Sequence, residues 1–399
     1  MERFGSEFVL GRNDTYDDWA TERRKYIGAL IDKWQWLLEG TEKQKLTPID
    51  EKHWGAMAML FENQQLHTRK YAAIEATKTT DVQLPVTYAL PIIRKVWPNL
   101  VAFKIASVQP MPMSSAGVMQ VFYQDFLRED ASNTNLVTPD SDYAQSEENA
   151  VPKRVKMQIV KQTVEADKKI LGASWSQEVE EDARGALNID IESALITQMS
   201  LEILHEIDQI ILAEILLWAA CGNVNWTWTN TTTWPDKSYY ETLGHALIDA
   251  EDLIYAQRFR RADWIVAGRR FVRFIRKMQD FVPAPRNQPF DAFKMGVENV
   301  GRLTGYWDVY LTSYINQDRA IMGCYPTSVV DTGYVFAPYI PLTPMPKVYA
   351  EYLPYDSDIA TEGPPGTYLN TDKWSRNVRT RYAKKLVVPQ LFSTLSIAA

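Results

Sequence analysis

The longest uninterrupted helical pattern in the chain covers residues 188–220 and contains neither glycine nor proline. Asn188 suits the cap of its first turn, and Gly222 follows its end. One apolar row at helical spacing comprises Met199, Ile203, Ile207 and Ile210. A second row beside it comprises Leu204, Ile211, Ile215 and Trp218. The two rows predict a long helix that other elements cover on more than one side.

The segments before this helix predict two further helices and a sheet. Apolar positions at helical spacing predict peripheral helices over residues 17–38 and from about residue 49 to residue 71. Residues 101–108 alternate like a strand and follow a short helix that would start at Pro91 and stop at Pro98.

Residues 118–126 and 154–165 predict the two strands of an antiparallel hairpin, joined by a long polar segment without an apolar period. Residues 111–152 carry seven acidic side chains and one arginine, so nearly all of the net negative charge of the chain lies here. A loop of this length is uncommon in a compact domain unless it binds something. The return strand begins with the bases Lys153, Arg154 and Lys156.

After the long helix the pattern changes, and a second domain is expected to begin near residue 223. Its amphipathic helix over residues 239–255 turns four residues inward, namely Leu243, Leu247, Ala250 and Ile254. A buried strand at residues 264–268 precedes a helix at 269–278, which indicates an α/β arrangement. Four more strands are expected near residues 306–311, 320–324, 334–339 and 374–388.

The composition fits a large folded protein. Of the 399 residues, 46% are hydrophobic, which is enough for large cores. A formal charge of −7 argues against extensive coating of nucleic acid, so we expect mainly protein partners. Glu202, Glu206 and Glu214 interrupt the long helix before the roughly 20 apolar residues that a membrane span needs. The start of the chain lacks a secretory signal pattern, so a protein made and kept in the cytoplasm is expected.

Residues that would carry catalysis, or bind a cofactor or metal, are not grouped in the sequence. Patterns for a nucleophile elbow, a phosphate loop and a zinc-protease helix are all missing. Cys221 and Cys324 stand alone and are interpreted as small buried residues. An acidic run at residues 140–142 lacks the glycine and glutamate of a calcium loop, since Gln145 and Val151 stand there. We therefore expect no enzyme activity, no cofactor and no metal.

A basic cluster in the second domain is the most distinctive group of charges. Its members are Arg258, Arg260, Arg261, Arg269, Arg270, Arg273, Arg276 and Lys277. On the helix that begins at Arg269, the charges take one face, while Phe271, Phe274 and Ile275 take the other and are expected in the core. The cluster is interpreted first as a solvated or protein-facing surface, with direct binding of nucleic acid as the alternative.

Four separated segments carry a resemblance to a known family. They are ALPIIRKVWPNLVAFKIASVQPM at residues 89–111, LEILHEIDQIIL at 201–212, a long stretch at 303–344 that begins LTGYWDVYL, and RTRYAKKLVV at 379–388. In this order they resemble the major capsid proteins of tailed bacteriophages with the HK97 fold, specifically the T-even-type subgroup.

The resemblance implies an α+β HK97-type fold with an extended hairpin loop, a spine helix and an inserted axial domain. The expected divisions are an N-terminal helical arm (1–85), peripheral-domain entry (86–112), acidic hairpin loop (113–152), peripheral domain with spine helix (153–222), axial α/β domain (223–335) and return to the peripheral domain (336–399). The hairpin is too short for the extra domain that T-even relatives carry in this loop, so clamping of a neighbour by such a domain is not expected. Residues 1–85 are expected to fold as arm helices.

The function implied is self-assembly into hexamers and pentamers of an icosahedral head that encloses double-stranded DNA. Expected partners are other copies, portal, scaffold and decoration proteins, and packaged DNA, in a virion capsid assembled in the host cytoplasm and without a membrane. Two alternatives stay open: an encapsulin-like compartment or capsid vertex protein of the same fold, and a cytoplasmic nucleic-acid-binding protein that uses the basic cluster.

The acidic hairpin is expected to lie across a neighbouring copy. The expected contact residues are Asp125, Arg128, Glu129, Asp130, Glu147, Glu148, Lys153, Arg154 and Lys156. Basic surface on the neighbour's spine helix or hairpin stem is the first expected target, and the basic cluster is the second. Between Lys104 and Lys153 there is no lysine, so the hairpin loop offers no amine for a covalent cross-link between subunits.

Overall fold

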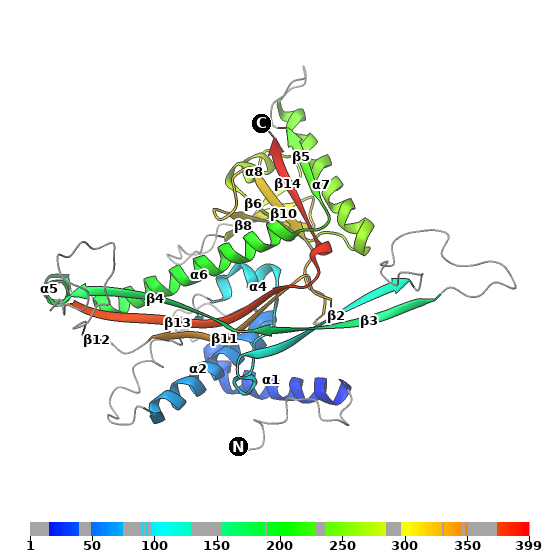
Figure 1. Ribbon diagram of the computed structural model, residues 1–399. Coiled ribbons are helices and arrows are strands. Elements are labelled where there is room, and N and C mark those ends of the chain that lie inside the picture. The colour runs from blue at the N-terminus through cyan, green and yellow to red at the C-terminus, as the bar shows by residue number, and fades with distance from the viewer. Residues whose placement is uncertain are drawn as a thin grey trace, which may run out of the picture.

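The computed structural model describes residues 16–39, 49–74, 90, 93–94, 97–128, 154–187, 190–227, 236–284, 297–328, 331–344, 348–349 and 373–398. An elongated sheet and a more compact second domain form the body, and the long helix α6 (Ile191–Trp218) lies between them (Figure 1). A two-stranded hairpin projects from one side of this body (Figure 1). The α+β class and the order of hairpin, long helix and inserted domain are those expected from the sequence.

The elongated sheet has five strands, and β13 is paired with three of the others. The strands are β1 (Ser107–Val108), β4 (Asp167–Ser176), β11 (Tyr334–Pro344), β12 (Val348–Tyr349) and β13 (Lys373–Leu386). β13 runs antiparallel to β11, β12 and β4. Nearly every residue of β11 is buried, as expected for a strand covered on both faces. The final predicted strand is thus confirmed, whereas β4 was not predicted.

Helix α6 confirms the predicted long helix. Its first apolar row is buried at Met199, Ile203 and Ile207. At the other end the prediction is wrong for Trp218, which is exposed together with Leu217. The last turn extends past Glu214, which accepts a hydrogen bond from Tyr334 and pairs with Lys384 of the elongated sheet. Beyond this attachment Ile215 is buried, but the described residues leave Leu217 and Trp218 uncovered. None of the described helices has the length and apolar character to cross a membrane.

The strand predicted over residues 101–108 is mostly wrong. Residues Val101–Ile105 form the short helix α4, and only β1 is extended, parallel to β11. The amide of Val101 donates a 3.0 Å hydrogen bond to Asp208 Oδ1 of α6, which satisfies a free N–H at the start of α4. Because this cap comes from another part of the chain, the local pattern does not reveal it.

The N-terminal helices are α1 (Tyr16–Leu38) and α2 (Trp54–Ile74), as predicted. They pack on one another through Trp34 and Phe61, whose ring centroids lie 5.7 Å apart. Asn63 of α2 is buried, and its amide donates to the carbonyls of Met111 and Tyr339 at 2.7 and 2.8 Å. The expectation of a peripheral arm is therefore corrected for α2, which is part of the core beneath the elongated sheet (Figure 1).

The second domain is built on a seven-stranded sheet in the order β5-β14-β10-β6-β9-β8-β7. Its strands are β5 (Asn223–Thr227), β6 (Trp264–Ala267), β7 (Phe281–Pro283), β8 (Val297–Leu303), β9 (Trp307–Thr312), β10 (Arg319–Gly323) and β14 (Phe392–Ala398). Helices α7 (Asp236–Arg258) and α8 (Arg269–Ile275) pack on it. The four positions of α7 predicted to face inward are all buried, and so is every residue of β6.

The domain boundaries differ from the expected ones at the end of the chain. Residues 336–399 were expected to return to the peripheral domain, but β14 pairs with β5 and β10 in the second domain. β11 begins at Tyr334 and already belongs to the elongated sheet. The chain therefore leaves the second domain, forms β11 and β13, and enters the second domain again through the turn η6 (Pro389–Leu391).

Candidate functional site

The hairpin consists of β2 (Val118–Arg128) and β3 (Val155–Glu165), paired antiparallel along their whole length. Ala116 and Gly117 both have positive φ, 52° and 83°, so the chain turns sharply into β2 at a position that suits glycine. The amide of Ala166 donates to the carbonyl of Gly117 at 2.8 Å and closes the base. These strands confirm the predicted hairpin, and they project beyond the body (Figure 1).

The two faces of the hairpin have different surroundings, because successive side chains of a strand point to opposite faces. Val121 and Val164 on one face are buried against the body. On the other face Val155, Met157 and Ile159 are 55, 54 and 57% exposed. We call the face that carries these three residues the outer face, and its distal part is uncovered and apolar. The sequence analysis did not identify it, although the alternation of β3 predicts which residues share it.

Asp125 lies on the inner face of β2, and its carboxylate is paired within the subunit. Arg258 Nη1, at the end of α7, donates to Asp125 Oδ1 at 2.7 Å. Arg258 Nη2 donates to Gln390 Oε1 of η6 at 3.1 Å. Asp125 was expected to contact a neighbour. In the subunit its carboxylate forms an ion pair with Arg258, and contact with a neighbour stays a prediction.

The other expected contact residues are only partly described. Arg154 directly precedes β3 and Lys156 lies at its exposed end. The backbone of Arg128 ends β2, and its side chain lies outside the described residues. The remaining members of the expected set also lie outside them: Glu129, Asp130, Glu147, Glu148 and Lys153.

The basic cluster divides into two groups in the structure. Three of its arginines form ion pairs within the subunit: Arg258 with Asp125, Arg260 with Asp331 at 2.7 Å, and Arg270 with Asp318 at 3.1 Å. The other five members are exposed, namely Arg261, Arg269, Arg273, Arg276 and Lys277. Phe271, Phe274 and Ile275 are buried, which confirms the predicted inner face of α8.

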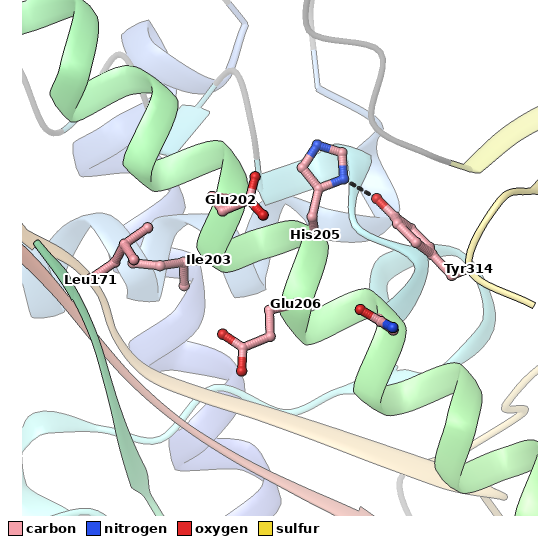
Figure 2. Close-up of a pocket in the computed structure, with 7 residues that line it drawn as sticks. Leu171, Glu202, Ile203, His205, Glu206 and Tyr314 are labelled. Carbon is pink, nitrogen blue, oxygen red and sulfur yellow. Dashed lines mark hydrogen bonds between the residues drawn. The ribbon is translucent and has the colours of Figure 1, made fainter. Parts of the chain in front are cut away.

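An open pocket of about 540 Å³ lies where α6, β4 and the second domain meet. In Figure 2 the His205 ring of α6 points to the hydroxyl of Tyr314, with which its Nδ1 forms a hydrogen bond. Glu202 and Glu206 stand on the same helix, and Lys169 pairs with Glu206. The pocket offers two carboxylates beside Leu171 and Ile203, but its lining supplies no serine, cysteine or threonine nucleophile. We interpret it as a contact between α6 and the second domain.

Asp208 is the residue of α6 whose environment the sequence analysis missed. It is fully buried, and burial raises the pKa of its carboxyl to about 8, against the opposing effects of the Val101 amide and the charge of Lys104. Its Oδ2 has no hydrogen-bond partner among the described residues. The signal was present in the sequence, because Asp208 lies at helical spacing from Leu204 and Leu212 on the buried side.

Neither a metal-ligand cluster nor a reactive thiol is found among the described residues. Within them no group of three or more histidine, cysteine or acidic side chains is placed to hold a metal ion. Cys221 and Cys324 are free and buried, as predicted. Burial raises the pKa of the two thiols, to about 11 and about 12, so both are poor nucleophiles at neutral pH.

The fold and the hairpin define a structural subunit that presents a projecting, partly apolar surface from a two-sheet body. A family model, major capsid protein Gp23, matches residues 124–353. The chain belongs to this family of bacteriophage capsid proteins.

Two relatives illustrate the distance within the family. The major capsid protein of Vibrio phage KVP40 is 24% identical over 207 residues, which are 47% of this chain and 40% of that protein. The major capsid protein of Enterobacteria phage T4 is 25% identical over 208 residues, with the same shares. The chain therefore matches about 40% of the length of these relatives. A solved structure from Mycobacterium phage Adephagia is 9% identical, with a TM-score of 0.46 over 75% of this chain and 90% of that chain.

Proposed function

We propose that the protein is a major capsid protein that assembles into hexamers and pentamers of an icosahedral head around double-stranded DNA. The observation that carries this proposal is the hairpin with its uncovered outer face. A two-stranded hairpin is at best marginally stable alone in water, and further strands or a covering surface stabilise it. Among the described residues the body supports the inner face, at Val121, Val164 and Asp125, so a second copy of the chain is the proposed cover for the outer face.

The free energy gained by covering the outer face suits a weak contact that is repeated between many copies. Full burial of a valine, isoleucine or methionine side chain contributes about 1.5–3 kcal/mol. Val155, Met157 and Ile159 are each about half exposed, so covering them contributes on the order of 1 kcal/mol per residue. A closed ring repeats this contribution at every interface, which suits stepwise assembly from soluble subunits.

The charges of the hairpin would then set its direction on the neighbour. Glu129, Asp130, Glu147 and Glu148 stay the proposed acidic contacts, and exposed bases such as Arg154 and Lys156 are their proposed targets. Exposed ion pairs contribute only about 0–1 kcal/mol each, so they affect orientation and rate of association more than total stability.

The double variant Met157→Lys/Ile159→Lys tests the outer face. Both side chains already face solvent in the subunit, so its circular dichroism and melting temperature should stay close to those of the native protein. Assembly, followed by light scattering and electron microscopy, should be lost because two charges would be buried at every interface. Val282→Lys, at an equally exposed apolar position of β7, is the matched control and should still assemble. Normal shells from the double variant would refute the proposed role of the hairpin.

The partners proposed from the resemblance are portal, scaffold and decoration proteins, with assembly in the host cytoplasm. For packaged DNA, the five exposed members of the basic cluster are the proposed phosphate contacts. The alternative of a monomeric nucleic-acid-binding protein is less favoured, because three of the eight bases are already paired within the subunit. Salt-dependent DNA binding by a stable monomer that never forms shells would support that alternative. A shell filled with cargo protein would support an encapsulin-like compartment.

A further inference from the structure

Arg258 connects three parts of the subunit. Its guanidinium bonds to Asp125 of the hairpin and to Gln390 of η6, and it stands at the end of α7 in the second domain. The side chains of Arg258 and Asp125 are only 17 and 16% exposed, so solvent and salt screen their attraction less than that of a surface pair. A planar guanidinium directs its two donor groups at fixed angles, which restricts the position of both acceptors.

The position of Asp125 along the hairpin gives this pair mechanical importance. The base of the hairpin is held at Val121 and Val164, which are buried against the body. Asp125 lies four residues further along β2 than Val121, or about 13 Å at the rise of a strand. A two-stranded ribbon twists more freely than a larger sheet. A second attachment point 13 Å from the first therefore limits the angle of the whole hairpin.

We propose that the Asp125–Arg258 pair is a positioning restraint that fixes the angle between the hairpin and the second domain, and thereby the curvature at which neighbouring copies meet. The part of this inference that concerns curvature rests on the proposed assembly. Identical subunits close into a shell only when the angle between neighbours repeats. Without the restraint the pivot of the hairpin moves back towards Val121, and the range of angles widens.

The angle can be measured in the full-length, unassembled protein with spin labels. Lys156→Cys places one label on β3 and Asp249→Cys places the other on exposed α7, and labelled protein is diluted with unlabelled protein. Cys221 and Cys324 are buried thiols with raised pKa values and react slowly. Pulsed electron paramagnetic resonance should give one narrow distance distribution. The Asp125→Ala variant, which removes both the charge and the acceptor, should give one roughly twice as wide, because one of two attachments is lost.

Arg260→Gln is the matched control, since it removes an ion pair of the second domain that does not involve the hairpin. Its distribution should stay narrow. If Asp125→Ala does not fold, Arg258→Lys serves in its place, because it keeps the charge and loses the two-pronged geometry. It should give an intermediate width. An unchanged width in the Asp125 or Arg258 variant, or equal broadening in Arg260→Gln, would overturn the restraint.

Particle geometry tests the second half of the inference. Asp125→Ala should give shells with a wider spread of diameters than native shells in electron micrographs, and Arg260→Gln should not. A broadened distance distribution together with native diameters would reject the link to curvature. If the native protein forms no shell at all, the proposed function fails, whereas the distance measurement still decides whether the pair restrains the hairpin.

Discussion

Asp208 places an ionisable group at the fully buried centre of the subunit. Its Oδ1 accepts a hydrogen bond from the Val101 amide, and this bond joins α6 to α4. Burial disfavours the charged form and raises the pKa of the carboxyl from an ordinary 3.8 to about 8. The residue therefore couples the contact between two helices to the pH of the medium.

We predict that this coupling is visible in the stability of the unassembled protein. The pKa of Asp208 is higher in the folded than in the unfolded protein, so the free energy of unfolding depends on pH. The contribution of Asp208 to it is fully present below the unfolded pKa near 3.8 and is lost as the pH rises towards 8. The loss should be on the order of 1 kcal/mol per pH unit within this window. Calorimetric melting temperatures of the native protein should fall from pH 5 to pH 9. Those of Asp208→Asn, which keeps the acceptor and removes the charge, should fall less.

Asp252→Asn removes an exposed carboxylate of α7 and is the control for this series. Its melting temperatures should follow the native curve. An Asp208→Asn curve parallel to the native one would show that Asp208 does not cause the dependence.

At the scale of elements, a buried amide on α2 joins this helix to the elongated sheet. Asn63 spans from the helix to two backbone carbonyls that belong to segments far apart in the chain, at Met111 and Tyr339. Neither carbonyl is free to find water while α2 is in place, since the residues around them are buried. Loss of α2 from its place would therefore leave both carbonyls buried without this hydrogen-bond donor.

We predict that Asn63→Ala destabilises the protein by about 1–3 kcal/mol per buried group left without a partner. Urea unfolding followed by circular dichroism measures this cost. Gln177→Ala removes an exposed hydrogen bond from the Gln177 side-chain amide to Glu181 in the short helix α5 (Gln177–Asp182). It should change stability by only a few tenths of a kcal/mol. Equal effects of the two substitutions would mean that α2 is not held by Asn63.

The sequence predicted elements with a clear one-sided pattern and missed those defined by distant partners. All four inward positions of α7 were predicted, because burial on one face leaves a helical period. Strand β8 was missed, because Val297, Val300 and Leu303 are spaced like a helix. The pairing of Asp125 with Arg258 joins residues 133 positions apart, and local spacing contains no information about it.

For the whole molecule, the hairpin loop bears on whether subunits of a shell can be cross-linked covalently. Between Lys104 and Lys153 the sequence has no lysine, so the loop supplies no amine for an isopeptide bond. We predict that assembled particles dissolve into monomers on a denaturing gel. A ladder of joined subunits with a cross-link mapped to residues 111–152 would contradict this.

The acidic loop should matter most at low ionic strength. We predict that reversal of Glu147 and Glu148 to lysine together slows assembly or widens the range of particle sizes, because opposed charges on the neighbour would become repulsive. Light scattering at low and high salt measures the effect, which should shrink at high salt as the Debye length falls from about 30 Å at 0.01 M to about 3 Å at 1 M. Normal assembly of the variant at low salt would exclude the loop as a charged contact.

The place of β14 between β5 and β10 has a consequence for synthesis of the protein. Thr394 pairs beside Asn223, 171 residues earlier in the chain, and β10 closes the other side of β14. A ribosome makes both neighbours before it makes β14. Until then β5 has no partner in the sheet and β10 has one unpaired edge, and unpaired strand edges are prone to pair with other chains. A translation product that stops before residue 392 would keep these edges unpaired, so only chains that pass this point can complete the second domain.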